Sequence, residues 1–222
     1  LGASTPQGDA TLQGTSFEIV NRSSGSVNVN GTDYQPGEVV ATIESDASGI
    51  ARTGSDVLPV GSYEVREAQP PTGYTANDAW SQNFTISSDG QVVDLTASTY
   101  ALGNEVIRGG VSLRKVDAEL RDALPLGDTT LAGARIEIVN ESDHAVRVNG
   151  VDYQPGEVVT TLTTDENGNC GTRSDLLPYG TYSASEVSVP EGYLLNEDWN
   201  PTFQIRTDGQ VVDLTSADRA VS

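Results

Sequence analysis

The chain repeats itself: shifted by 119 residues, it overlays on itself without a gap. Thr15–Asn21 matches Ala134–Asn140, and Asn30–Val40 matches Asn149–Val159. About half of the overlaid positions are identical. A period this long is the length of a domain and not of one solenoid unit. The 222 residues therefore favour two tandem copies of one domain, and two copies in series indicate a function based on length and spacing.

Each copy has the pattern of an all-β sandwich. Short runs rich in Val, Ile, Thr and Tyr are separated by Gly, Pro, Asn and Asp, as is typical of such folds. The second copy opens with a strand expected over Gly110–Asp117, and Asn30-Gly31 predicts a two-residue hairpin turn because both residues tolerate positive φ. In the first copy we expect strands near residues 15–20, 27–29, 38–43, 50–53, 61–67, 83–86, 91–95 and 102–107.

Charge and hydropathy exclude several classes of partner. The chain has 32 acidic residues against 12 Lys plus Arg, a formal net charge of −20. Such a chain repels nucleic acid and anionic membrane, so we expect neither as a partner. It has no apolar run long enough to span a bilayer. It also has no initiator methionine and no signal or anchoring segment, so we expect a monomeric fragment of a longer protein.

The residues that usually carry enzyme chemistry are scarce. Cys170 is the single cysteine and His144 the single histidine; we interpret the thiol as structural and the imidazole as a surface group. Asp165–Asn169 has part of the spacing of a calcium loop, but its glycine is misplaced, which favours a turn. Trp80 and Trp199 occupy equivalent positions, where packing on a sheet is favoured over sugar stacking. We therefore expect no metal, no cofactor and no enzyme activity in the usual sense.

One string carries more chemical information than the rest. Tyr63–Tyr74 reads Tyr-x-x-x-Glu-x-x-x-Pro-x-Gly-Tyr, and Tyr182–Tyr193 repeats it. Residues four apart on a strand share a face. Glu67 and Glu186 therefore point the same way as the first tyrosine of their string, which is a natural core residue. A carboxylate on an apolar face is costly, so both acids are candidate functional residues.

These motifs, with the Leu-Pro-x-Gly-x-Tyr lead-in at Leu58–Tyr63, resemble the Cna B-type repeat domains of Gram-positive surface adhesins and pilins. The resemblance covers both copies and implies two tandem Ig-like, prealbumin-like β-sandwich domains. In that family a first-strand lysine and a last-strand asparagine form a spontaneous amide crosslink, promoted by a buried acid. The resemblance assigns the acid to Glu67 and Glu186, the lysine to Lys115 and the asparagine to Asn104.

The assigned chemistry suits these residue types. Burial disfavours the charged form of an amine, and a neutral amine is nucleophilic. A protonated carboxyl can hold a proton against the asparagine carbonyl and pass protons to departing ammonia. Such a reaction turns over once within one chain, so only autocatalytic bond formation is expected of the acids.

Neither copy contains a complete set of these residues. Lys115 is the only lysine, and its first-copy equivalent falls before Leu1 in the 119-residue offset. The second-copy equivalent of Asn104 falls one residue after Ser222. We therefore expect a first domain over residues 1–107 without its first strand and a second over residues 108–222 without its last. Lys115 and Asn104 would each bond to a partner outside these residues.

The sequence thus predicts structural stalk repeats of an adhesin anchored in a Gram-positive cell wall. Their partners would be neighbouring repeats, and other regions of the protein would present a distal site to host extracellular matrix or glycan. The alternative is that the repeats themselves bind a host protein or glycan, for which an exposed aromatic patch would be the evidence.

Overall fold

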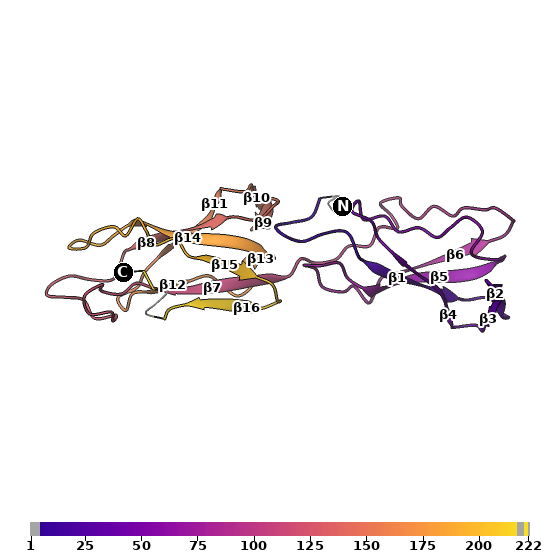
Figure 1. The fold of residues 1–222 in the computed structure, drawn as a ribbon, viewed down its shortest axis with the longest axis horizontal. Helices are drawn as coiled ribbons and strands as arrows, with labels where there is room; N and C mark the ends of the chain where they lie inside the picture. Colours follow the sequence, from indigo (N-terminus) through magenta and orange to yellow (C-terminus); the bar gives the residue numbers. More distant parts are fainter. Residues whose placement is uncertain (1–4, 217–219, 222) are drawn as a thin grey trace. The chain divides into compact units, whose positions relative to one another are not determined.

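The computed structural model describes residues 5–216 and 220–221, and in these residues it contains sixteen β-strands and no helix (Figure 1). The all-β prediction is therefore confirmed. The chain divides into two compact units: unit 1 comprises Leu1–Pro6 and Thr11–Glu105, and unit 2 comprises Gln7–Ala10 and Val106–Ser222. The short segment Gln7–Ala10, which the repeat places in the first copy, thus packs with unit 2.

Unit 1 is built on one four-stranded antiparallel sheet with the order β4-β1-β5-β6, plus a β2-β3 hairpin. Val29 pairs with Thr32 across Asn30-Gly31, whose φ angles are 51° and 85°. Both central residues have positive φ, as a type I′ turn requires, which confirms the predicted hairpin turn. The strands are β1 Ser16–Asn21, β2 Val27–Val29, β3 Thr32–Tyr34, β4 Val39–Glu44, β5 Gly61–Gln69 and β6 Ser81–Ile86.

Unit 2 has the equivalent sheet, in the order β11-β8-β14-β15, and the equivalent hairpin β9-β10. A second sheet runs β12-β7-β13, and β16 pairs with β7 in parallel. These strands are β7 Arg108–Arg114, β8 Arg135–Asn140, β9 Val146–Val148, β10 Val151–Tyr153, β11 Val158–Thr163, β12 Asn169–Gly171, β13 Leu177–Pro178, β14 Gly180–Ser188, β15 Thr202–Ile205 and β16 Gln210–Leu214.

Three strand predictions for the first copy are wrong, at residues 50–53, 91–95 and 102–107, none of which is a named strand. The first two are strands at the equivalent place in unit 2, namely β12 and β16, and both of those pair with β7. The first-copy equivalent of β7 would precede Leu1 in the 119-residue offset. Among the described residues of unit 1, no named strand takes the place of β7 beside these segments, although Val93 and Leu95 still pack on the core.

Each unit has its own apolar core, placed by the alternation of its strands. In unit 1 the buried Tyr63 ring stacks on Phe84 with ring centroids 5.5 Å apart. Tyr182 stacks on Phe203 in the same way in unit 2, at 5.6 Å. Such aromatic pairs contribute about 0.5–1.5 kcal/mol beyond their burial. The repeated sequence therefore produces the same core contact twice.

Candidate functional site

Glu186 lies on the inner face of β14, as the sequence pattern predicts. Tyr182, Ala184 and Glu186 are all buried, at every second position of the strand. The Tyr182 hydroxyl donates to the Pro178 carbonyl at 2.8 Å. This bond ties the start of β14 to the residue two positions before it. Glu186 is thus held among apolar side chains with only 5% of its surface exposed, and a carboxylate buried to this extent needs a partner.

Lys115 follows directly after β7 and is fully buried. Its amide donates to the Gly168 carbonyl at 2.7 Å, and the residue forms a parallel bridge with Val221. Val116 N and Val221 O, 2.8 Å apart, extend this pairing by one residue. The backbone around Lys115 is therefore held on both sides, and its fully buried side chain extends into the core.

The two buried side chains meet. Lys115 Nζ and Glu186 Oε1 are 2.8 Å apart, and neither side chain is exposed to solvent. Nζ also lies 5.3 Å from the centroid of the Tyr193 ring, and the Asn196 amide donates to Glu186 Oε2 at 3.3 Å. Among the described residues, neither Nζ nor Oε1 has an aligned hydrogen bond. The site is therefore a desolvated amine–carboxyl pair with hydrogen-bonding capacity to spare.

Unit 1 pairs its acid with the amide side chain instead of an amine. Asn104 Nδ2 donates to both Glu67 oxygens, at 2.8 and 3.0 Å, and to the Thr75 carbonyl at 2.9 Å. The Asn77 amide donates to Glu67 Oε2 at 2.6 Å. Both Glu67 and Asn104 are half-buried. The side-chain amide of Asn104 thus contacts the acid that the family resemblance assigns to it.

In each unit the acid of the repeated motif contacts a different side chain. Unit 2 brings together Lys115 and Glu186, and unit 1 brings together Glu67 and Asn104. The acids lie 119 residues apart and accept a backbone N–H from equivalent residues, Asn77 and Asn196. The sequence analysis did not find this N–H donor. An asparagine lies three residues after the tyrosine that closes each motif. This shared residue was the signal that could have indicated the donor.

The other residues that the sequence singles out have structural environments. The Asp165 carboxylate accepts from the amides of Asn167 and Asn169, both at 2.9 Å, so this segment is the expected turn. Trp80 packs edge-on against Phe17, with centroids 5.6 Å apart, and donates to the Tyr100 carbonyl at 3.0 Å. Within residues 5–216 and 220–221, no cluster of three His, Cys, Asp or Glu could hold a metal ion.

The single cysteine and the single histidine take different roles. Burial, with a smaller contribution from the Asp165 charge, raises the pKa of the Cys170 thiol to about 12, so almost no thiolate is present at neutral pH. The expectation for His144 is wrong: the ring is half-buried, with Nδ1 3.0 Å from the Gly8 carbonyl oxygen. A carbonyl oxygen only accepts hydrogen bonds, so Nδ1 is the protonated nitrogen in this geometry.

Asn21 and Asn140 are a pair of buried polar residues that the sequence analysis overlooked. Asn140 Nδ2 donates to the carbonyls of His144 and Tyr153, and its Oδ1 accepts from the Ser142 amide. Asn21 makes the equivalent bonds in unit 1. The Ile-Val-Asn string that ends β1 and β8 was the available signal. These residues hold the turn that follows each strand.

The chain was compared with known families and structures. The family described as "SpaA: Prealbumin-like fold domain" matches residues 5–100 and 109–219. The Bacillus anthracis TIE protein is similar in structure, with 25% identity and a TM-score of 0.56, over 93% of this chain and 31% of that chain. No curated protein sequence matches. The chain thus spans about a third of the TIE protein.

Two further solved structures come from Lactobacillus rhamnosus GG. A mutant of the shaft pilin SpaA has 20% identity and a TM-score of 0.33, over 90% of this chain and 85% of that chain. The pilus adhesin SpaC has 18% identity and a TM-score of 0.48, over 93% of this chain and 25% of that chain. No long apolar helix that could cross a bilayer occurs in the part of this chain that the structure describes.

Proposed function

The chain belongs to the family of SpaA-type prealbumin-like fold domains, and on that premise we propose that its two copies are stalk repeats of a Gram-positive cell-surface protein. The observation that carries this proposal is the fully buried Lys115–Glu186 pair, whose Nζ and Oε1 are 2.8 Å apart. A packed apolar core would be at least as stable with two hydrophobic residues in these positions. We therefore assign the pair a chemical role, the formation of one amide bond.

The proposed reaction joins the first and last strands of the domain. Lys115 Nζ, as a neutral amine, attacks the side-chain carbonyl carbon of an asparagine. A new carbon–nitrogen bond forms, the original bond to the asparagine nitrogen breaks, and ammonia leaves. Glu186 takes the proton from the attacking nitrogen and returns it to the departing one. No oxidant and no cofactor enters this balance.

The backbone pairing of Lys115 supports a partner position for it beyond Ser222. Val221 bridges Lys115 in parallel and is fully buried. Residues two apart on a strand share a face, so a side chain at position 223 would point into the same core. In the 119-residue offset that position corresponds to Asn104, which contacts Glu67. An asparagine at position 223 would therefore meet the equivalent acid, Glu186.

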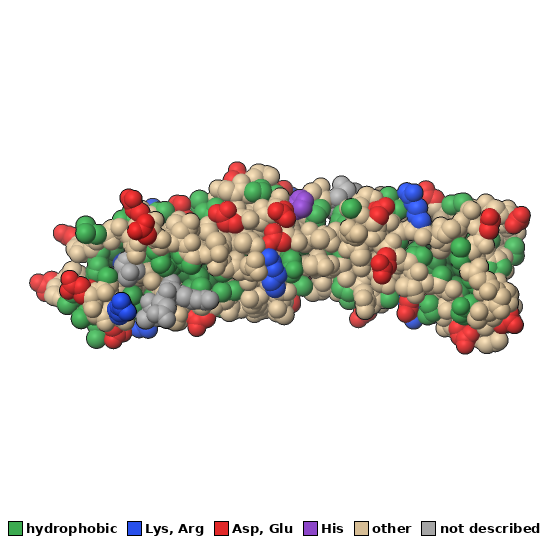
Figure 2. All heavy atoms as spheres, in the orientation of Figure 1, with side chains coloured by type: hydrophobic (Ala, Val, Ile, Leu, Met, Phe, Trp, Pro, Cys, Tyr) green, Lys and Arg blue, Asp and Glu red, His purple; other side chains and the backbone are tan. Residues whose placement is uncertain are grey.

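A bond between these strands gives the stalk its mechanical strength. Load that enters at the first strand and leaves at the last would pass through a covalent bond instead of through strand hydrogen bonds. Closing a loop of about 100 residues would also stabilise the fold by roughly 4.7 kcal/mol in the chain-entropy model. Figure 2 shows acidic side chains spread over the face in view. With a net charge of −20, the repeats would stay soluble as spacers between neighbouring repeats.

A force measurement tests the stalk function. The chain is continued in phase after Ser222 by a repeat of Asn104–Gly110 and stretched from its ends, with alanine in place of asparagine at position 223 as the matched control. The control should release Val116–Ser222 on unfolding, a step of roughly 350–390 Å at the length of an extended chain. The chain with asparagine should show no such step. A step of equal size in both chains would contradict the proposal.

A further inference from the structure

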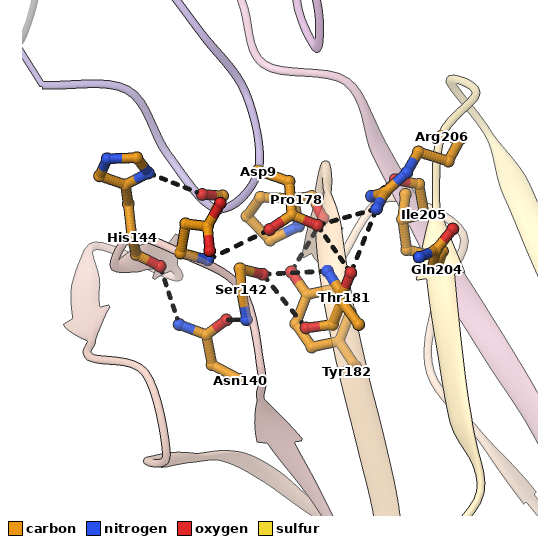
Figure 3. Close-up of polar contacts among 12 residues, drawn as sticks. Asp9, Asn140, Ser142, His144, Pro178, Thr181, Tyr182, Gln204, Ile205 and Arg206 are labelled. Atoms are coloured by element: carbon orange, nitrogen blue, oxygen red, sulfur yellow. Dashed lines mark hydrogen bonds and ion pairs between the residues drawn. The ribbon is translucent and has the colours of Figure 1, made fainter.

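The four-residue segment Gln7–Ala10 packs against unit 2 (Figure 3). It contacts the segments around His144, Tyr179 and Arg206, and we call this surface the socket. The Gly8 amide donates to the Ala145 carbonyl at 3.1 Å, and the Gly8 carbonyl accepts from the His144 amide at 3.1 Å. The Asp9 amide donates to the Tyr179 carbonyl at 3.3 Å. The segment is thus held by backbone bonds on both sides, much as an added strand would be.

The Asp9 carboxylate adds a charged contact to these backbone bonds. It lies 2.8 Å from Arg206 Nη2 and accepts from the Thr181 hydroxyl at 2.7 Å and from the Asp143 amide at 3.2 Å. Figure 3 shows the carboxylate facing Thr181 and Arg206. The Arg206 guanidinium also stacks over the Tyr179 ring, 4.6 Å from its centroid. The Asp9 side chain is only 18% exposed, so this ion pair is partly shielded from solvent.

Glycine is required at position 8 for two reasons. Its φ is +58°, in the left-handed region. A Cβ at this position would also overlap the carbonyl oxygen of Tyr179. The segment Gln7–Ala10 is closed by a bond from the Ala10 amide to the Gln7 carbonyl at 2.9 Å. It is therefore a preformed turn with glycine at its first central position, shaped to fit the socket.

The second copy carries the same turn, but there it is exposed. Leu126–Thr129 is the equivalent of Gln7–Ala10 in the 119-residue offset and keeps its Gly-Asp pair. The Thr129 amide donates to the Leu126 carbonyl at 3.2 Å, and Gly127 has a φ of +62°. Leu126, Gly127 and Asp128 are all exposed, and a Cβ at Gly127 would meet nothing within 4 Å.

We propose that Leu126–Thr129 is a docking loop that completes the socket of a further domain of this same kind. Its seated geometry is that of Gln7–Ala10 in unit 2, since the two turns share their closing bond and the sign of the glycine φ. A socket of the unit 2 type offers Asp128 an arginine and a hydroxyl, the equivalents of Arg206 and Thr181. The proposal concerns how repeats join and does not depend on the crosslink.

The sockets of the two copies differ in charge. The docking loop should therefore bind one type of socket more tightly than the other. The equivalents of Arg206 and Thr181 in unit 1 are Ser87 and Ser62. A hydrogen bond to a charged partner is about twice as strong as one between neutral groups. The loop should therefore dock more tightly on a domain with a cation at the Arg206 position than on one with serine there.

The first test asks whether the second-copy loop fits the observed socket. Gln7→Leu with Ala10→Thr converts Gln7–Ala10 into the sequence of Leu126–Thr129 in the full chain. We expect amide hydrogen exchange of Gly8 and His144 to stay within about threefold of the parent. Adding Asp9→Asn to this variant should raise exchange at Gly8 at least tenfold. Loss of protection in the first variant, with the strands of unit 2 still protected, would overturn the proposal.

The second test supplies the partner. The chain is continued in phase after Ser222 by a second copy of residues 104–222, which provides a socket of the unit 2 type. Protection of the Gly127 amide should rise at least tenfold over that in the parent chain, and serine at the added equivalent of Arg206 should remove most of the gain. Folded added strands with Gly127 exchanging as in the parent would overturn the proposal. Intact mass, read on the same sample, reports the crosslink separately.

Discussion

Replacing Glu186 with alanine should lower the free energy of unfolding of unit 2 by about 3–5 kcal/mol. The reason is the environment of Lys115, whose side chain is fully buried and whose Nζ lies 2.8 Å from Glu186 Oε1. Without the carboxylate, the amine must either stay buried without a partner or lose its proton. The measurement is native-state amide hydrogen exchange in β8 and β14, which reports unit 2 alone. A single melting temperature would mix the two units.

A double variant separates the loss of a charge partner from the loss of side-chain volume. Lys115→Met combined with Glu186→Leu removes both charges and keeps the core filled, so its stability should lie within about 1–2 kcal/mol of the parent. Glu67→Ala is the matched control in unit 1. Glu67 is half-buried, so its loss should cost less than the loss of Glu186. Equal costs for the two alanine variants, or no recovery in the double variant, would contradict a desolvated pair at Lys115.

Gly8→Ala should destabilise unit 2 by about 2–4 kcal/mol, the second-largest effect that we expect. The added Cβ overlaps the Tyr179 carbonyl, and φ at this position is +58°. The segment Gln7–Ala10 would therefore leave its socket, with loss of its backbone bonds and of the ion pair between Asp9 and Arg206. Each such bond contributes about 0.5–1.5 kcal/mol. Exchange of the His144 amide, which donates to Gly8, should rise with it.

Gly127→Ala is the control for backbone strain. Gly127 has a φ of +62° but open space around its Cβ position, so this variant should cost only about 1 kcal/mol, the strain of a left-handed residue. The difference between the two variants isolates the socket contacts. If Gly8→Ala and Gly127→Ala cost the same, the seated segment contributes nothing measurable to unit 2.

Much of this fold could be predicted because strand alternation and turn chemistry are local properties of the sequence. The orientation of Glu186 follows from its four-residue spacing from Tyr182, and the hairpin at Asn30-Gly31 follows from the tolerance of both residues for positive φ. The sequence does not predict the strand Thr32–Tyr34, because three residues are too few to show an alternation of apolar and polar side chains. Its existence follows only from the turn that precedes it.

Other features depend on partners that the local sequence does not contain. Residues 91–95 and 210–214 share the string Gln-Val-Val-Asp-Leu, yet only the second is a strand, because only it lies beside β7. Gly8-Asp9 and Gly127-Asp128 are identical pairs, yet only the first is seated. Glu67 is half-buried where Glu186 is buried. The roles of these acids, of Lys115 and of Asn104 stay predictions.

The intact mass of the chain completed in phase tests the central claim most directly. With Asn104–Gly110 repeated after Ser222, the protein should weigh one ammonia less than calculated, about 17 mass units, because amine attack on an amide expels ammonia. Trypsin should then release a branched peptide that joins Lys115 to position 223. Glu186→Ala, or alanine at position 223, should restore the calculated mass. A completed chain with unit 2 folded and its full calculated mass would contradict the account.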